Sequence, residues 1–371
     1  MTAGIKWIVD FTDPEAPALT QDLVVALAER GVPSTVEAEH EVSESGGQGR
    51  VPGPLRGLLG RRLDYDRVVV NTTPDRWPAI VAREPGVRCV GLTDWETDAL
   101  PESWVPGAES VAEVWVPSTW SREVFVGSGV EVPVVAIPRC RPALEHAAST
   151  PEALNGLPDR TFVFYSILEW NACSNAEDLL IAYWSAFSGV RDVALVLVCL
   201  PRGADSDDRA IRREVQRVKR EVNLAHYPRL VTLPGGCTPA ELVAVHQRGD
   251  CFALLGRGGG WAGEPFAAAA RGNPVVACRH GAAVDYLNDE TGFLVNVTYR
   301  PVAGMHPSSL YVGTQTWAQP DLAQAVDRFR QIRADEETAR VVGERAAARI
   351  ARDFSPQRIA DRMLGCLYRS A

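Results

Sequence analysis

Short apolar runs rich in β-branched residues alternate along the chain with longer amphipathic stretches, in two successive series. In the first series Thr20 is placed to cap a helix that ends at Gly31, and Ser118 is placed to cap another. The predicted strands are Ile5–Val9, Val68–Asn71, Arg88–Leu92, Glu113–Pro117 and Val132–Ile137, then Thr161–Leu168, Val193–Leu200, Leu230–Leu233, Cys251–Leu255, Pro274–Ala277 and Gly292–Val295. Further helices are predicted at 175–188, 206–223, 239–248 and over most of 319–370.

Each series predicts a parallel sheet that is covered by helices on both faces, because its strands are almost continuously apolar. The fold class is therefore α/β, with two Rossmann-like, doubly wound domains. Ligands of such sheets bind at the carboxyl ends of the strands, and a cleft between two domains is the natural site. The alternation breaks within 139–160, and the polar, glycine-rich segment 41–60 is expected to be a mobile loop.

Composition narrows the class of protein. The chain has 371 residues, 46% of them apolar, and a net charge of −9, which argues against a general nucleic-acid binder. Its eight cysteines form no C-x-x-C pair, so we expect reduced thiols in the core rather than disulfides. No apolar run approaches a membrane span and no secretory h-region is evident, so the expected location is the cytoplasm. The six histidines lack the spacing of a metal site, and no bound metal is expected.

The most informative stretch is the glycine-rich segment 256–277, which follows one predicted strand and leads through a short helix into the next. Gly258, Gly259 and Gly260 allow the backbone to come close to a ligand, and the N-terminus of the following helix favours a diphosphate. Glu264 is the only carboxylate of this stretch. The residues predicted to bind the nucleotide are Arg257, Gly258, Gly259, Gly260, Trp261, Ala262, Gly263 and Phe266 from this stretch, and Glu169, Ser174, Leu233 and His280 from other strand ends.

The second half of the chain resembles the GT-B-fold, retaining glycosyltransferases of family 4. One branch of that family carries a run similar to H-R-G-E-G-W-G-L-P-x-F-E-A-A-A-x-G-N-P-V-I-A-T, and residues 257–277 match it at most positions. Further matching segments are Asp94–Trp104, Glu113–Ser118, Phe162–Trp170, Asp285–Leu287, Gly292–Val295 and Trp317–Leu322. The resemblance covers roughly residues 85–350 and is specific, because separate motifs occur in the family's order.

The resemblance implies two Rossmann-like domains facing each other across a cleft: an acceptor domain at 1–145, a linker at 146–160 and a nucleotide-sugar domain at 161–353. It also implies that the tail helix 354–371 packs back on the first domain. The implied activity is transfer of a sugar, with retention of configuration, from a nucleotide-diphosphate sugar to a small-molecule or glycan acceptor. The nucleotide sugar is then a co-substrate, and no permanently bound cofactor is expected. Asp94 and Glu96 follow a predicted strand and are candidates to bind or deprotonate the acceptor hydroxyl.

The chain departs from the family at four charged positions. Gly259 and Ala267 stand where the family has two glutamates, and Cys173 with Ser174 stands where it commonly has an Arg-Lys pair. Each lost carboxylate removes a contact worth roughly 1.5–3 kcal/mol. Glu264 either takes over from the lost glutamates or merely complements the helix dipole, and both interpretations stay open. Arg257, Arg279 and His280 could replace part of the lost positive charge.

These departures leave three hypotheses. The first is a metal-independent glycosyltransferase. The second is a catalytically impaired relative that acts as a partner or regulatory subunit of another glycosyltransferase, or as a ligand binder. The third is a GT-B enzyme adapted to form a different bond. A partner glycosyltransferase and a homodimer are both possible assemblies.

Overall fold

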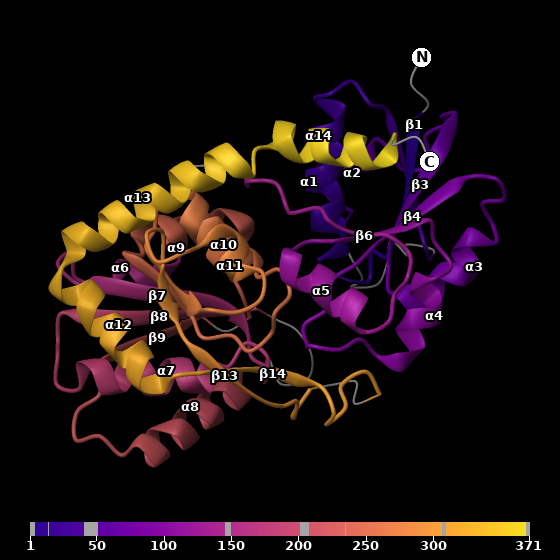
Figure 1. Ribbon diagram of the computed structural model, residues 1–371. Helices are drawn as coiled ribbons and strands as arrows, with labels where there is room; N and C mark the ends of the chain where they lie inside the picture. The colour runs from indigo at the N-terminus through magenta and orange to yellow at the C-terminus, as the bar shows by residue number, and fades with distance from the viewer. Residues whose placement is uncertain are drawn as a thin grey trace. The chain divides into compact units, whose positions relative to one another are not determined.

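The computed structural model describes residues 4–13, 15–40, 51–144, 150–200, 208–233, 235–305 and 309–368 (Figure 1). The chain divides into two compact units: Met1–Pro142 with Arg352–Ala371, and Ala143–Ala351. Each unit is built on a six-stranded sheet in which neighbouring strands run parallel. The predicted α/β class with two doubly wound parallel sheets is therefore confirmed.

The sheet of the first unit has the strand order β2-β1-β3-β4-β5-β6. Its central strands carry side chains such as Trp7 and Trp115 that are fully buried in the core, which explains their uninterrupted apolar sequence. The strands are β1 (Gly4–Val9), β2 (Ser34–Ala38), β3 (Tyr65–Asn71), β4 (Arg88–Leu92), β5 (Glu113–Val116) and β6 (Val134–Ala136). The helices are α1 (Ala16–Ala28), α2 (Gly53–Arg56), α3 (Trp77–Val81), α4 (Val105–Ala108), α5 (Thr119–Gly127) and α14 (Pro356–Leu367), with 3-10 turns η1 (Pro74–Arg76) and η2 (Glu102–Trp104).

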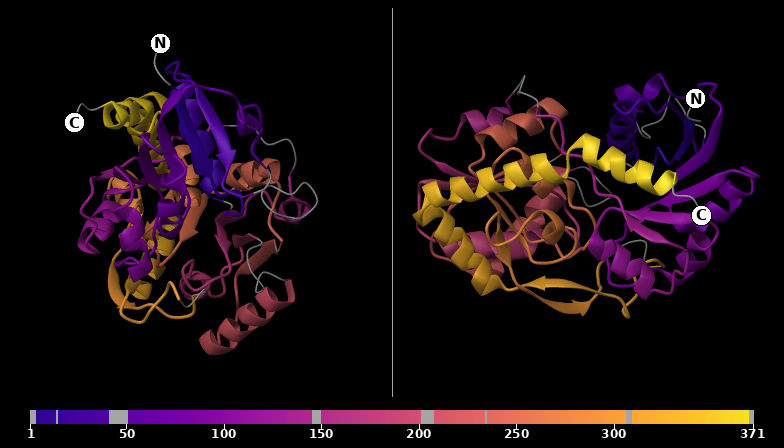
Figure 2. Two further views of the ribbon diagram at one scale, coloured as in Figure 1. Left: turned by 90° about the vertical axis from the view of Figure 1, so that its right-hand side faces the viewer. Right: turned by 45° about the horizontal axis from the view of Figure 1, so that its top comes forward.

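The last helix, α14, belongs to the same unit as the first strand (Figure 2). It begins after Ser355, whose hydroxyl accepts a hydrogen bond from the backbone of Arg358, and it packs against α1. Its apolar face joins the core of this unit through Ile359, Ala360, Met363, Cys366 and Leu367. On the outer side, Arg30 and Asp361 form an ion pair of 2.7 Å.

The sheet of the second unit has the order β12-β11-β10-β7-β8-β9. Side chains alternate between its two faces. Phe164 packs against Tyr183 and Phe187 of α7, whereas Tyr165, the next residue, bonds to His246 of α9. The strands are β7 (Phe162–Glu169), β8 (Val193–Leu200), β9 (Arg229–Leu233), β10 (Cys251–Leu254), β11 (Val275–Cys278) and β12 (Phe293–Val295). The helices are α6 (Glu152–Asn155), α7 (Ala176–Phe187), α8 (Asp208–Val222), α9 (Pro239–Arg248), α10 (Gly263–Ala270), α11 (Ala283–Tyr286), α12 (Leu322–Ala334) and α13 (Glu336–Asp353).

Some local elements differ from those predicted. β2 was not predicted, and neither was the antiparallel pair β13 (Val297–Pro301) and β14 (Thr316–Pro320). Of the expected loop 41–60, residues 41–50 lie outside the described residues, and the remainder contains α2. Of the expected linker 146–160, residues 146–149 are likewise outside the described part of the chain, and α6 lies in the rest.

Candidate functional site

The three glycines Gly258, Gly259 and Gly260 lie where the sequence places them, in the loop between β10 and α10. β10 has β11 and β7 as its two neighbours, so the loops after these three strands meet at one edge of the sheet. The backbone N–H of Arg257 donates to the carbonyl of Cys173 at 2.7 Å, which joins this loop to the one after β7. The N–H of Ala282 donates to the carbonyl of Gly259 at 2.9 Å, which joins it to the loop after β11. The segment is therefore held from both sides by backbone hydrogen bonds.

The close approach of the loops after β10 and β11 depends on glycine. Gly281 has φ +63°, and a Cβ at this position would lie 2.3 Å from the Cα of Gly259. No side chain fits there without displacement of the glycine-rich segment. The bare backbone of 258–260 is thus positioned by a second glycine that is distant in the sequence.

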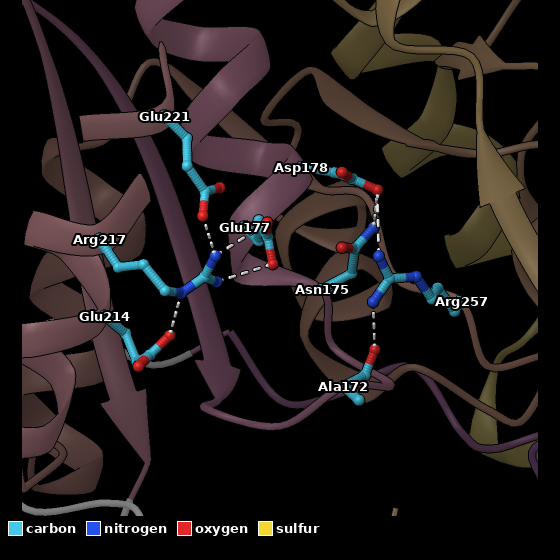
Figure 3. A network of polar contacts seen from close by, with 8 residues as sticks. All are labelled: Ala172, Asn175, Glu177, Asp178, Glu214, Arg217, Glu221 and Arg257. Atoms are coloured by element: carbon cyan, nitrogen blue, oxygen red, sulfur yellow. Dashed lines mark hydrogen bonds and ion pairs between the residues drawn. The ribbon is translucent and has the colours of Figure 1, made fainter. Parts of the chain in front are cut away.

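Arg257 is a buried side chain of this loop, 7% exposed. Its guanidinium donates to the carbonyl of Ala172 at 2.7 Å and pairs with Asp178 at 3.3 Å (Figure 3). It also lies over the ring of Trp317, 5.8 Å from the ring centre. Burial lowers the pKa of Arg257, and Asp178 opposes that effect. The guanidinium thus ties the glycine-rich loop to the loop after β7 and to α7.

Asp178, in the first turn of α7, is the centre of this buried cluster. Its Oδ2 accepts hydrogen bonds from Asn175 at 2.7 Å and from Gln319 of β14 at 2.8 Å, in addition to the contact with Arg257. Asn175 also donates to the carbonyl of Leu255 and adopts the left-handed conformation, with φ 57°. A carboxylate with three donors is the arrangement that makes a buried charge tolerable. Neither Asp178 nor Gln319 was identified from the sequence.

Glu264 lies in the first turn of α10 and is half-buried. Its carboxylate is 3.9 Å from Nε2 of His246, a residue of α9 that is 5% exposed. Nδ1 of the same ring is 2.9 Å from the hydroxyl of Tyr165, which also accepts from Asn273 at 2.5 Å. Burial, with Arg271 adding to the effect, lowers the pKa of His246 to about 4, so the ring is neutral near pH 7. Glu264 therefore stands beside a neutral, buried imidazole.

The remaining predicted residues of the glycine-rich segment form its apolar support. The ring of Trp261 is 5% exposed and packs 4.9 Å from Phe266 and 5.4 Å from Tyr286, measured between ring centres. Ala262 is the N-cap of α10 without a side-chain hydrogen bond, and Gly263 begins the helix. The first turn of α10 thus has no side-chain cap at Ala262, and the positive end of the helix dipole lies beside the glycine-rich loop.

The other predicted residues of this unit lie at neighbouring strand ends. Glu169 is the last residue of β7, and the backbone N–H of Ser174 donates to Asn171 Oδ1 at 2.8 Å. His280 follows β11, is buried, and has Nδ1 3.4 Å from the hydroxyl of Tyr299. Leu233 ends β9, which is separated from β7 by β8. Arg279 is bonded to Asp289 and Asn296.

Asp94 and Glu96, the predicted acceptor residues, belong to the first unit and follow β4. Oδ1 of Asp94 accepts from the backbone N–H of Trp95 at 2.8 Å and from the hydroxyl of Ser121 at 3.0 Å. Trp95 is 4% exposed and packs edge-on against Trp104, with 4.7 Å between the ring centres. Asp94 therefore connects the end of β4 to α5, and both it and Glu96 are half-buried.

A second polar cluster of the first unit was not identified from the sequence. Arg76 donates to Asp10 and to Glu39, both at 2.9 Å, and the carboxylates follow β1 and β2 respectively. Thr12 donates its backbone N–H and its hydroxyl to Asp10 at 2.8 and 2.6 Å. Burial opposes ionisation of Asp10, but the bonds from Thr12 and Arg76 lower its pKa below the ordinary value. β1 and β3 flank the point at which this strand order reverses, which is where open α/β sheets bind ligands.

No group of three or more His, Cys, Asp or Glu side chains among the described residues is arranged to hold a metal ion. Within the same described ranges, no helix has the length and apolar character needed to cross a membrane.

No protein-family model matches the sequence, and no curated protein matches it. The fold is similar along its length to several solved structures. One is sucrose-phosphate synthase from Thermosynechococcus elongatus, with TM-score 0.67 and 18% identity over 99% of this chain and 98% of that chain. Another is HepE from Anabaena in complex with UDP and glucose, with TM-score 0.68 and 13% identity over 98% of this chain and 99% of that one. A third is a UDP-forming α,α-trehalose-phosphate synthase from Burkholderia xenovorans, with TM-score 0.64 and 14% identity over 100% of both chains. The similarity establishes that the chain has the GT-B fold.

Proposed function

We propose that this protein is a glycosyltransferase that takes its sugar from a uridine-diphosphate sugar. The observation that carries the proposal is the glycine-rich loop and uncapped start of α10, at the carboxyl edge of a sheet in a GT-B fold. Support for uridine comes from HepE, whose structure contains UDP, and from the UDP-forming synthase, both similar to this chain over nearly their full length.

In this proposal the diphosphate faces the backbone of Gly258–Gly260 and the first turn of α10. Helix N–H groups and the helix dipole supply positive potential where the leaving pyrophosphate gains charge. Arg257 acts indirectly, because its guanidinium is already bound to Asp178 and Ala172 and so holds the loop in place. Glu264, in the first turn of α10, is the carboxylate proposed to accept hydroxyl hydrogen bonds from the transferred sugar.

The acceptor is proposed to bind in the amino-terminal domain, residues 1–145 with the tail helix, while residues 161–353 bind the nucleotide sugar. Asp94 and Glu96 are the proposed acceptor residues, and Asp10 and Arg76 are added to them from the polar cluster after β1. Carboxylates accept hydrogen bonds from hydroxyl groups, which suits a polyol or glycan acceptor. We also propose that the protein belongs to family 4 and that it transfers the sugar with retention of configuration. Both proposals rest on the motif at 257–277.

The first experiment is calorimetric titration with UDP, GDP and ADP, and then with UDP-glucose. UDP should bind more tightly than the other two nucleotides. Absence of binding by all three would reject the transferase and support a non-catalytic partner subunit. If UDP-glucose is turned over, NMR of the product shows whether the anomeric configuration is retained, and an inverted product would reject the family assignment.

A further inference from the structure

A cavity of about 960 Å³ lies in the second unit, beside the loop after β7. Its walls are the loop after β7, the first turn of α7, one side of α8 and the segment that leaves β13. Of residues 255–270, Arg257 alone contributes to the lining. Gly304, in the segment after β13, packs so closely on the loop after β7 that its Cβ would lie 3.3 Å from that of Ala172. The volume is within the range of small-molecule sites.

The charges on the cavity walls differ in how far they are compensated. Arg217 of α8 is bonded to Glu177, Glu214 and Glu221 at 3.0, 2.8 and 2.7 Å, as Figure 3 shows. On the other side of the first turn of α7, Arg257 is paired with Asp178 (Figure 3). These two arginines connect the walls of the cavity, and their positive charges are already compensated by carboxylates.

Arg213 and Arg300 are the cations that remain. Arg213 lies on α8, four residues before Arg217, and Arg300 lies on β13, so they line the cavity from two different elements. Both are exposed, and among the described residues neither guanidinium has a hydrogen bond or an ion pair. A phosphate group is the ligand best matched to guanidinium groups, which bind its oxygens through two parallel hydrogen bonds.

The carboxylates of the lining restrict the ligand further. Four of them, Glu169, Glu177, Asp178 and Glu214, equal the four arginines in number. A strongly polyanionic ligand therefore gains no net attraction. The same carboxylate oxygens have lone pairs left to accept hydrogen bonds from hydroxyl groups. The lining thus suits a ligand with one phosphate and several hydroxyls.

We propose that this cavity is a binding site for a sugar phosphate or a similar phosphorylated polyol, with Arg213 and Arg300 holding the phosphate. The proposal does not depend on the activity proposed above. Because the acceptor is proposed to bind in the amino-terminal domain, the ligand of this cavity is an effector.

The experiment is calorimetric titration of the full chain with glucose 6-phosphate, inorganic phosphate and glucose. Glucose 6-phosphate should bind most tightly and glucose most weakly. Arg213→Ala and Arg300→Ala should each weaken the binding of glucose 6-phosphate by about tenfold or more, because a charge-assisted contact is lost. Arg212→Ala is the matched control: this neighbour on α8 does not line the cavity and is bonded to Asp208. Both exposed arginines can be removed without disturbing the core.

Three results would overturn the proposal: no binding of glucose 6-phosphate or phosphate at millimolar concentration, equal losses in all three variants, or displacement of glucose 6-phosphate by UDP. Displacement would mean that the phosphate occupies the nucleotide site instead. UDP binding should be unchanged in Arg213→Ala and Arg300→Ala, so failure of this site is distinguishable from failure of the glycosyltransferase proposal. Mass analysis after incubation with UDP-glucose should show that glucose 6-phosphate gains no sugar, and a glucosylated product would overturn its assignment as an effector.

Discussion

The buried pair of Arg257 and Asp178 gives a quantitative test of how the candidate site is held together. We expect Arg257→Met, which keeps the apolar stem, to destabilise the second unit by about 3 kcal/mol. Removal of one partner from a buried pair costs about 3–5 kcal/mol, because the other charge stays in the interior. The side chains here are 8% and 9% exposed, so solvent cannot replace the lost partner. The lower value applies because Asp178 keeps its hydrogen bonds from Asn175 and Gln319.

A double-mutant cycle separates the charge interaction from other effects. Asp178→Asn should also destabilise the unit, whereas the double variant should cost less than the sum of the two, with a coupling of about 1–3 kcal/mol. Urea unfolding gives the free energies, and each kcal/mol should lower Tm by roughly 2–4 °C for a unit of this size. Hydrogen exchange of peptides from α7 assigns the loss to the second unit.

The control is the exposed pair of Arg212 and Asp208, which has a shorter contact of 2.8 Å but side chains 72% and 42% exposed. Arg212→Met should leave stability close to that of the unmodified protein, because solvent screens an exposed ion pair. If Arg257→Met costs no more than this control, or if the double variant is simply additive, then the reasoning that burial makes the pair important is wrong.

Three further predictions concern the same unit. The pKa of His246 is lowered to about 4 from 6.5, so the unfolded state takes up the proton first, and the free energy of unfolding is full above pH 6.5 and falls below it by about 1.4 kcal/mol per pH unit. His246→Asn should flatten this pH dependence in urea titrations between pH 5 and 7, and an unchanged slope would contradict the assignment. Gly281→Ala should destabilise the unit and weaken UDP binding, because its Cβ meets Gly259. Gly189 has a similar φ but open space around it, so Gly189→Ala measures the backbone strain alone, about 1–3 kcal/mol. Equal losses of stability in the two variants would exclude the clash. Glu264→Gln should lower UDP-glucose hydrolysis by roughly tenfold if the carboxylate contacts the sugar, and unchanged turnover would leave it a helix-dipole residue.

Strand positions were predictable where burial on both faces leaves an unbroken apolar run. Arg88–Leu92 and Val193–Leu200 were predicted with the bounds that the structure gives them, and the latter is buried at every position but its last. β2 was missed because it is a short edge strand whose sequence, Ser-Thr-Val-Glu-Ala, lacks such a run. The pair β13 and β14 was missed for a related reason, since β13 is mostly exposed.

The candidate site was predictable only as far as it is contiguous in the sequence. The loop from Arg257 to Gly263 could be located because a glycine run between a strand and a helix is itself a signal. The partners of the side chains in this loop could not be located from the sequence. Asp178 lies 79 residues from Arg257 in sequence, and an acidic residue in the first turn of a helix ordinarily means no more than a favourable dipole interaction. A visible signal was missed in the first unit, where Asp10 directly follows the predicted strand β1; Glu39 follows β2, which was not predicted.

The contribution of α14 to the first unit has a consequence for how the protein is made. A ribosome releases the strands β1 to β6 first, yet the core they form is completed by Ile359, Met363 and Leu367, which emerge only after the whole of the second unit. The second unit, which lies between these two parts of the chain, contains all of its own core and can fold earlier. During translation the nascent first unit therefore exposes the apolar surface of α1 until the tail arrives. Ribosome-bound chains that end at residue 351 and continue into an unrelated linker long enough to span the exit tunnel should carry a folded second unit and a first unit that binds chaperones.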